Sequence, residues 1–79
     1  MTMKEKLNAY FETEYQAAVQ LLQNPPKWYT ETEKRNMIWN TVNRCLGAAM
    51  VAQEFGLPYE DTKAYDEYLE KFRKLLLDI

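Results

Sequence analysis

Two side chains mark the places in this sequence where chemistry could occur, Glu14 and Cys45. On a helical wheel, Glu14 falls between Leu7 and Leu21, inside an otherwise apolar stripe. Because an unpaired buried carboxylate is strongly unfavourable, we expect Glu14 either to meet a donor such as Arg44 or to open onto a cleft. Glu14 and Arg44 are therefore the candidate buried polar residues. The first alternative makes Glu14 structural, and the second makes it a ligand-binding or partner-binding carboxylate.

Residue types that catalysis commonly needs are missing from the chain. It contains no histidine and no serine, and histidine is the commonest general base and nitrogen metal ligand. Cys45 is the only cysteine, so neither an intramolecular disulfide nor a pair of zinc-ligating thiols can form. Its place on an apolar helix face predicts a buried, reduced thiol. We expect no enzymatic activity, no metal site and no cofactor.

The stretch 52–58, AQEFGLP, resembles the first helix and turn of a DNA-binding helix-turn-helix, in which Ala-x-x-apolar-Gly-apolar is a familiar opening. The resemblance would extend over residues 48–70 and implies a nucleic-acid-associated regulator. The following segment departs from the pattern, because Glu60, Asp61 and Asp66 would be repelled by phosphates. A helix cap followed by a proline-initiated helix explains the same residues.

Three helices must position these residues. Thr2 with Glu5, and Thr30 with Glu33, have the spacing of capping boxes and predict helices that start near residues 3 and 31. Two consecutive prolines end the first helix near residue 23, and Gly56 ends the second near residue 55. A third amphipathic pattern covers residues 59–77. No strand pattern occurs.

The short connections predict a single all-α domain over residues 1–79, an antiparallel three-helix bundle around a long central helix. The main apolar face of this central helix is expected to bury six residues and to be widened by Trp39 and Met50. Trp28, in the first connection, is expected to close the edge of the core. The six residues are Ile38, Val42, Cys45, Leu46, Ala49 and Ala52.

The central helix has more apolar surface than two neighbours can cover. Met37, Ala48, Val51 and Phe55 lie on an outer flank, which makes them the candidate interface. A contiguous apolar flank on a small protein more often marks an interface than idle surface, and two-fold symmetry is the commonest arrangement of like chains. We therefore expect a homodimer or another protein partner. The alternative is that the connection containing Trp28 folds over the flank.

Composition and charge narrow the remaining possibilities. Hydrophobic residues make up 47% of the chain and charged residues 28%, which is ordinary for a compact fold. The net charge of −2 offers no positive field for nucleic acid or for an anionic membrane. No apolar run is long enough to span a membrane, so a cytoplasmic location is expected. The sequence thus favours a small, non-catalytic, self-associating interaction module over a nucleic-acid-associated regulator.

Overall fold

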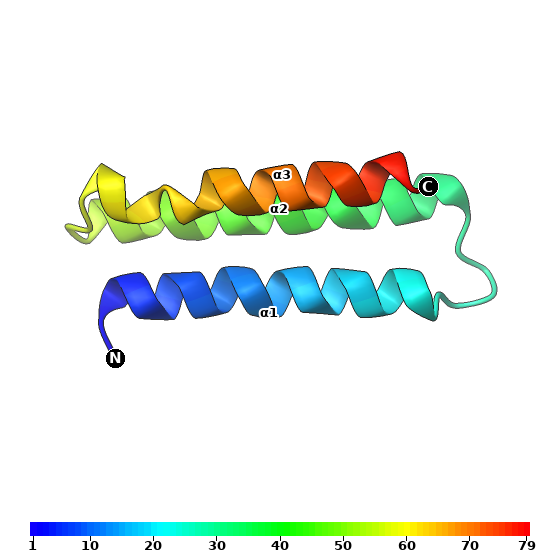
Figure 1. Cartoon of the computed structure of the whole chain (residues 1–79), viewed down its shortest axis with the longest axis horizontal. Coiled ribbons are helices and arrows are strands. Elements are labelled where there is room, and N and C mark those ends of the chain that lie inside the picture. The colour runs from blue at the N-terminus through cyan, green and yellow to red at the C-terminus, as the bar shows by residue number, and fades with distance from the viewer.

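A computed structural model describes all residues from 1 to 79 and contains three helices and no strand. Helix α1 is Met3–Gln23, α2 is Glu31–Glu54 and α3 is Ala64–Leu77. Successive helices run in opposite directions, and each contacts both others along an elongated molecule of 42 × 20 × 16 Å (Figure 1). The all-α, three-helix antiparallel bundle predicted from the sequence is confirmed.

Both long helices begin at the capping boxes seen in the sequence. The Thr2 hydroxyl accepts from the Glu5 amide, and the Glu5 carboxylate accepts from the Thr2 amide. Thr30 and Glu33 repeat this arrangement at the start of α2. Each box satisfies amides that would otherwise lack a partner within the helix, which fixes the register at which the helix starts.

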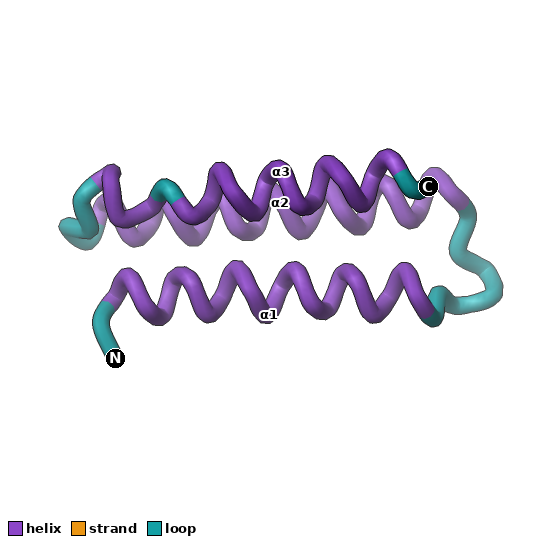
Figure 2. Tube along the Cα trace, in the orientation of Figure 1, coloured by secondary structure: helices purple, strands orange, loops and turns teal.

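The second connection differs from the expected uninterrupted third helix. Gly56 has a φ of +101°, a conformation that suits glycine, and it closes α2 one residue after Phe55. A short 3₁₀ helix, η1, follows at Tyr59–Thr62, and α3 begins only at Ala64. The Thr62 hydroxyl donates to the Tyr59 carbonyl at 2.7 Å, a local side-chain bond within this turn. Figure 2 shows this break and the short connections at the two ends of the bundle.

The core lies along the line where the three helices meet. Its buried apolar residues come mostly from α1 and α2, with Phe72 from α3 at 1% exposure. Cys45 is fully buried, as predicted. The other members are Leu7, Phe11, Ala18, Ile38, Val42, Ala49 and Ala52.

Three expected core positions are wrong. Leu46, Trp39 and Met50 are all exposed, because α1 and α3 cover a narrower arc of α2 than its apolar pattern suggests. Trp28 is also exposed, at 69%, and stacks edge-on against Tyr29 instead of closing the core. The apolar surface left uncovered is therefore larger than predicted.

Aromatic rings hold α1 against α3. Tyr15 packs edge-to-face on both Tyr68 and Phe72, with ring centroids 6.1 and 5.5 Å apart. Phe11, which is fully buried, lies between Tyr65 and Tyr68. These tilted pairs have the geometry that aromatic quadrupoles favour, and each adds about 1 kcal/mol beyond burial. No helix contains an apolar stretch of the length and hydropathy that a membrane span requires.

Candidate protein-interaction face

The face of the α1–α2 pair that points away from α3 carries two hollows, which we call together the outer groove. The larger hollow, of about 610 Å³, lies between the start of α1 and the end of α2. The smaller, of about 290 Å³, lies at the other end, beside the first connection. Arg44 lines both hollows and separates the larger one from the smaller one.

Arg44 and Glu14 cross the groove between the two hollows. The Arg44 Nη2 atom lies 2.9 Å from Glu14 Oε2, which joins α2 to α1. The Glu14 side chain is 20% exposed and the Arg44 side chain 54%, so the carboxylate is half-buried while the guanidinium reaches solvent. Glu14 thus meets one of the donors proposed for it. The description of Arg44 as buried is wrong, because Arg44 lies at the rim of the α1–α2 contact.

The charge of Glu14 affects the titratable groups around it. Burial raises the pKa of Cys45 to about 11, and the nearby Glu14 carboxylate adds to the rise. Burial and the same carboxylate raise the pKa of Tyr10. Arg44 acts in the opposite sense on both groups. A thiol with so high a pKa is not a nucleophile near neutral pH, which removes Cys45 as a candidate reactive group.

The larger hollow contains most of the predicted interface. Ala48 and Val51 from α2, with Phe55 just after its end, line one side of it, and residues near the start of α1 line the other. Phe55 is 76% exposed and Val51 50%, and both are contiguous with the partly buried side chains of the groove floor. The lining residues from α1 are Met3, Lys6, Leu7 and Tyr10. These α1 residues were missed by sequence reasoning, although Met3, Lys6 and Tyr10 share one side of the α1 wheel.

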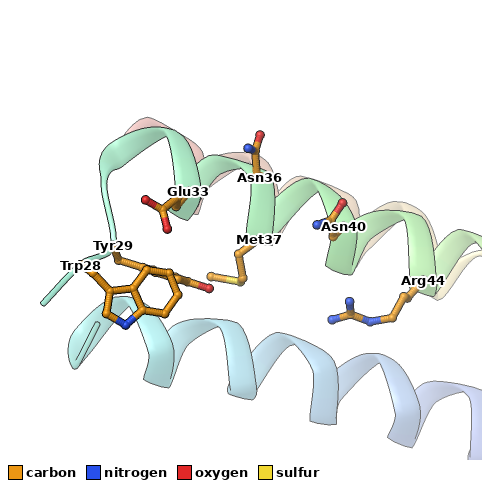
Figure 3. Close-up of a pocket in the computed structure, with 7 residues that line it drawn as sticks. All are labelled: Trp28, Tyr29, Glu33, Asn36, Met37, Asn40 and Arg44. Carbon is orange, nitrogen blue, oxygen red and sulfur yellow. The ribbon is translucent and has the colours of Figure 1, made fainter. Parts of the chain in front are cut away.

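Met37, the fourth predicted interface residue, lies apart from the other three. It is half-buried in the smaller hollow, where its side chain points toward α1 beside Trp28 and Tyr29 (Figure 3). In the same view Arg44 also points toward α1, whereas Asn36 points away from it. The first connection therefore covers only the Met37 end of the flank. It does not line the hollow that contains Val51 and Phe55.

A second polar cluster joins α1 to α3 and was not foreseen. The Tyr68 hydroxyl donates to Glu12 Oε2, while Gln16 donates to the other oxygen of this carboxylate at 3.0 Å. Lys71 Nζ lies 4.6 Å from the centre of the Tyr68 ring, in cation–π geometry. Burial and the hydrogen bond to Glu12 raise the pKa of Tyr68 to about 12. The cluster fastens α3 to the bundle and leaves the outer groove on the opposite side of α1 free.

The packing of α2 against α3 differs from the arrangement of the two helices in a helix-turn-helix. In that motif two helices cross at about 90–120°. Here α2 and α3 lie side by side in opposite directions (Figure 1). The Gln53 side chain donates a hydrogen bond to the Thr62 hydroxyl at 3.0 Å, which holds η1 against the end of α2.

Comparisons of the chain with protein-family models, with curated proteins and with solved structures found no match.

Proposed function

We propose that this protein is a non-catalytic interaction module that associates with a second copy of itself through the outer groove. The observation that carries the proposal is the larger hollow, about 610 Å³ and lined mainly by apolar side chains, which no element of the chain covers. The exposed Val51 and Phe55 at its edge enlarge the apolar surface. A contiguous apolar surface of this kind is the usual mark of an interaction site.

Gly47 supports a close approach by another chain. Glycine inside a helix costs about 1 kcal/mol relative to alanine. Within the monomer nothing explains this cost, since a Cβ atom built on Gly47 would have no atom within 4 Å. The residue lies at the edge of the larger hollow, beside Ala48. Together these two small residues give a partner helix room to approach the backbone of α2.

The charges of the groove support a protein partner. Lys6 and Arg44 are the charged residues lining the larger hollow, and Arg44 already pairs with Glu14. Two cations are too few for a track of phosphate contacts. No observation in the structure favours the alternative of a nucleic-acid-associated regulator.

The concentration dependence of the melting temperature tests the proposal. Dimerisation that is coupled to folding makes the melting temperature rise with protein concentration, by mass action. We expect this rise for the wild type and its loss in Val51→Glu, which places a charge in the hollow. Leu77→Glu is the matched control, because Leu77 is 83% exposed on α3 and lies outside the groove. A melting temperature of the wild type that is independent of concentration would refute self-association.

A further inference from the structure

We infer that, in the dimer, α1 of each protomer lies on α2 of the other, and that Glu14 and Arg44 form reciprocal ion pairs between the two chains. The inference rests on the proposed function, since it specifies how the second copy occupies the outer groove. Arg44, which lines both hollows, pairs with the Glu14 carboxylate, and the larger hollow beside this pair is lined mainly by apolar side chains.

The register of α1 against α2 brings further residues of the two helices to the same level along the groove. Because the helices are antiparallel, two turns toward the start of α1 correspond to two turns toward the end of α2. From Glu14 and Arg44 this step leads to Leu7 and Val51, which both line the larger hollow. The residues of α1 and α2 at one level therefore form matched pairs along this part of the groove.

Two-fold symmetry then decides which helices meet. Two identical faces that pack on each other are related by an axis in the plane of the interface. An axis parallel to the helices places α1 of one protomer over α2 of the other, at the same level. Glu14 then faces the partner's Arg44, and Arg44 faces the partner's Glu14. An axis perpendicular to the helices at the level of this pair places each Arg44 against its own symmetry mate and each Glu14 against its own, which is unfavourable because like charges then face each other.

The side chains have the capacity for these additional contacts. Arg44 uses only its Nη2 atom in the bonds to Glu14 and Thr41, although a guanidinium carries five N–H donors. The Arg44 side chain is also 54% exposed, so its free donors can reach a second carboxylate. Each guanidinium would bridge two carboxylates, and each carboxylate two guanidinium groups. Such alternating charges stabilise one register and disfavour shifted ones.

The resulting interface has a common architecture and a footprint below the standard size. The two α1 and two α2 helices would form a four-helix bundle in which every neighbouring pair is antiparallel. The face from Met3 to Leu21 is about 27 Å long at ~1.5 Å per residue, and two adjacent helices are about 20 Å wide. Its flat footprint of about 540 Å², before surface relief is included, approaches the ~800 Å² that each partner of a standard interface buries.

Charge variants separate this arrangement from the ion pair within one chain. Glu14→Arg creates a chain with two arginines at the centre of the groove, and Arg44→Glu creates one with two glutamates. Each variant alone is expected to dimerise at least roughly tenfold more weakly than the wild type, because like charges face each other. An equimolar mixture of the two is expected to form a heterodimer. Native mass spectrometry counts the species, and circular dichroism checks that each monomer is helical.

Cysteine cross-linking then tests which residues of the two chains lie opposite each other in the dimer. In a Cys45→Ala background, chains with Lys6→Cys are mixed with chains that carry Val51→Cys. Both residues are exposed and line the groove at neighbouring levels. The inferred arrangement predicts a disulfide between the two different chains in preference to either symmetric product. Preferential Val51→Cys homodimers would instead place α2 on α2 and would overturn the inference.

The outcomes distinguish this inference from the proposed function. A wild type that stays monomeric at all concentrations refutes both. A wild type that dimerises, combined with charge variants that dimerise equally well alone or a mixture that forms no heterodimer, refutes the reciprocal ion pairs and leaves self-association standing.

Discussion

The guanidinium of Arg44 joins the Glu14 carboxylate on α1 to the hydroxyl of Thr41 on its own helix. Its Nη2 atom lies 2.9 Å from Glu14 Oε2 and 3.0 Å from Thr41 Oγ1. Thr41 is 1% exposed and donates in turn to the Met37 carbonyl at 2.8 Å. A half-buried acid, an exposed base and a buried hydroxyl therefore form one chain of hydrogen bonds across the outer groove.

Removing Arg44 is expected to cost modest stability. Arg44→Met keeps most of the aliphatic side chain. It leaves the half-buried Glu14 carboxylate and the buried Thr41 hydroxyl without the Arg44 donor. Because Arg44 is half exposed, we expect a loss of about 1 kcal/mol or less in the free energy of unfolding of the monomer. Urea unfolding measures it at a concentration where the protein is monomeric. A double-mutant cycle with Glu14→Gln isolates the coupling, and a coupling of zero would show that the pair contributes nothing.

The Cys45 thiol is expected to react slowly in the native protein. Its pKa is about 11, against an ordinary value of 9.0, so at pH 8 the thiolate is about a hundredfold less populated than in an unfolded chain. Complete burial also blocks access to the sulfur atom. The rate of reaction with a disulfide reagent, with and without concentrated guanidinium chloride, measures the difference. Equal rates under the two conditions would contradict a buried thiol.

Phe72→Ala is expected to unfold most of the protein. The Phe72 side chain is 1% exposed and contacts Tyr15 edge-to-face, and truncation of such a core residue costs about 3–5 kcal/mol. A domain of this size has a total stability of only about 3–5 kcal/mol. Circular dichroism at 25 °C should show the loss of helix. Leu77→Ala, on the same helix but exposed, should leave the spectrum and the melting temperature unchanged.

High pH is expected to destabilise the bundle through Tyr68. Its pKa is raised from 10.0 to about 12, so the folded state favours the neutral phenol. This contribution is complete below pH 10 and is lost as the pH rises toward 12. The free energy of unfolding should therefore fall over this range, and less steeply in Tyr68→Phe. Tyr10, Tyr65 and Cys45, whose pKa values are also raised, should produce the remaining slope. An identical slope in Tyr68→Phe would show that Tyr68 does not contribute.

Local signals in the sequence predict the helices well. The two capping boxes and Gly56 act through hydrogen bonds and backbone conformation within a few residues, so their effect does not depend on the rest of the fold. The start of α3 is less predictable. Pro58 permits either an α-helix or a 3₁₀ turn, and the bond between Gln53 and Thr62, which only the folded chain brings together, accompanies the 3₁₀ form.

Long-range packing limits what the sequence predicts about the site. The apolar pattern of α2 is broad, and nothing in it shows that Leu46 and Trp39 fall outside the arc covered by α1 and α3. The contact of Glu14 with Arg44 was among the expected options because both lie near the middle of antiparallel helices. The contributions of Met3 and Lys6 to the groove depend on how α1 rotates about its axis, which amphipathicity defines only coarsely.

Sedimentation equilibrium of the wild type, from about 1 to about 100 µM, tests self-association most directly, since this range spans dissociation constants typical of small-protein dimers. We predict a mass that rises from one chain toward two, and a mass of one chain throughout for Val51→Glu. Leu77→Glu should behave as the wild type. A wild-type mass equal to one chain across the whole range would contradict the account and would leave a different protein as the partner for the outer groove.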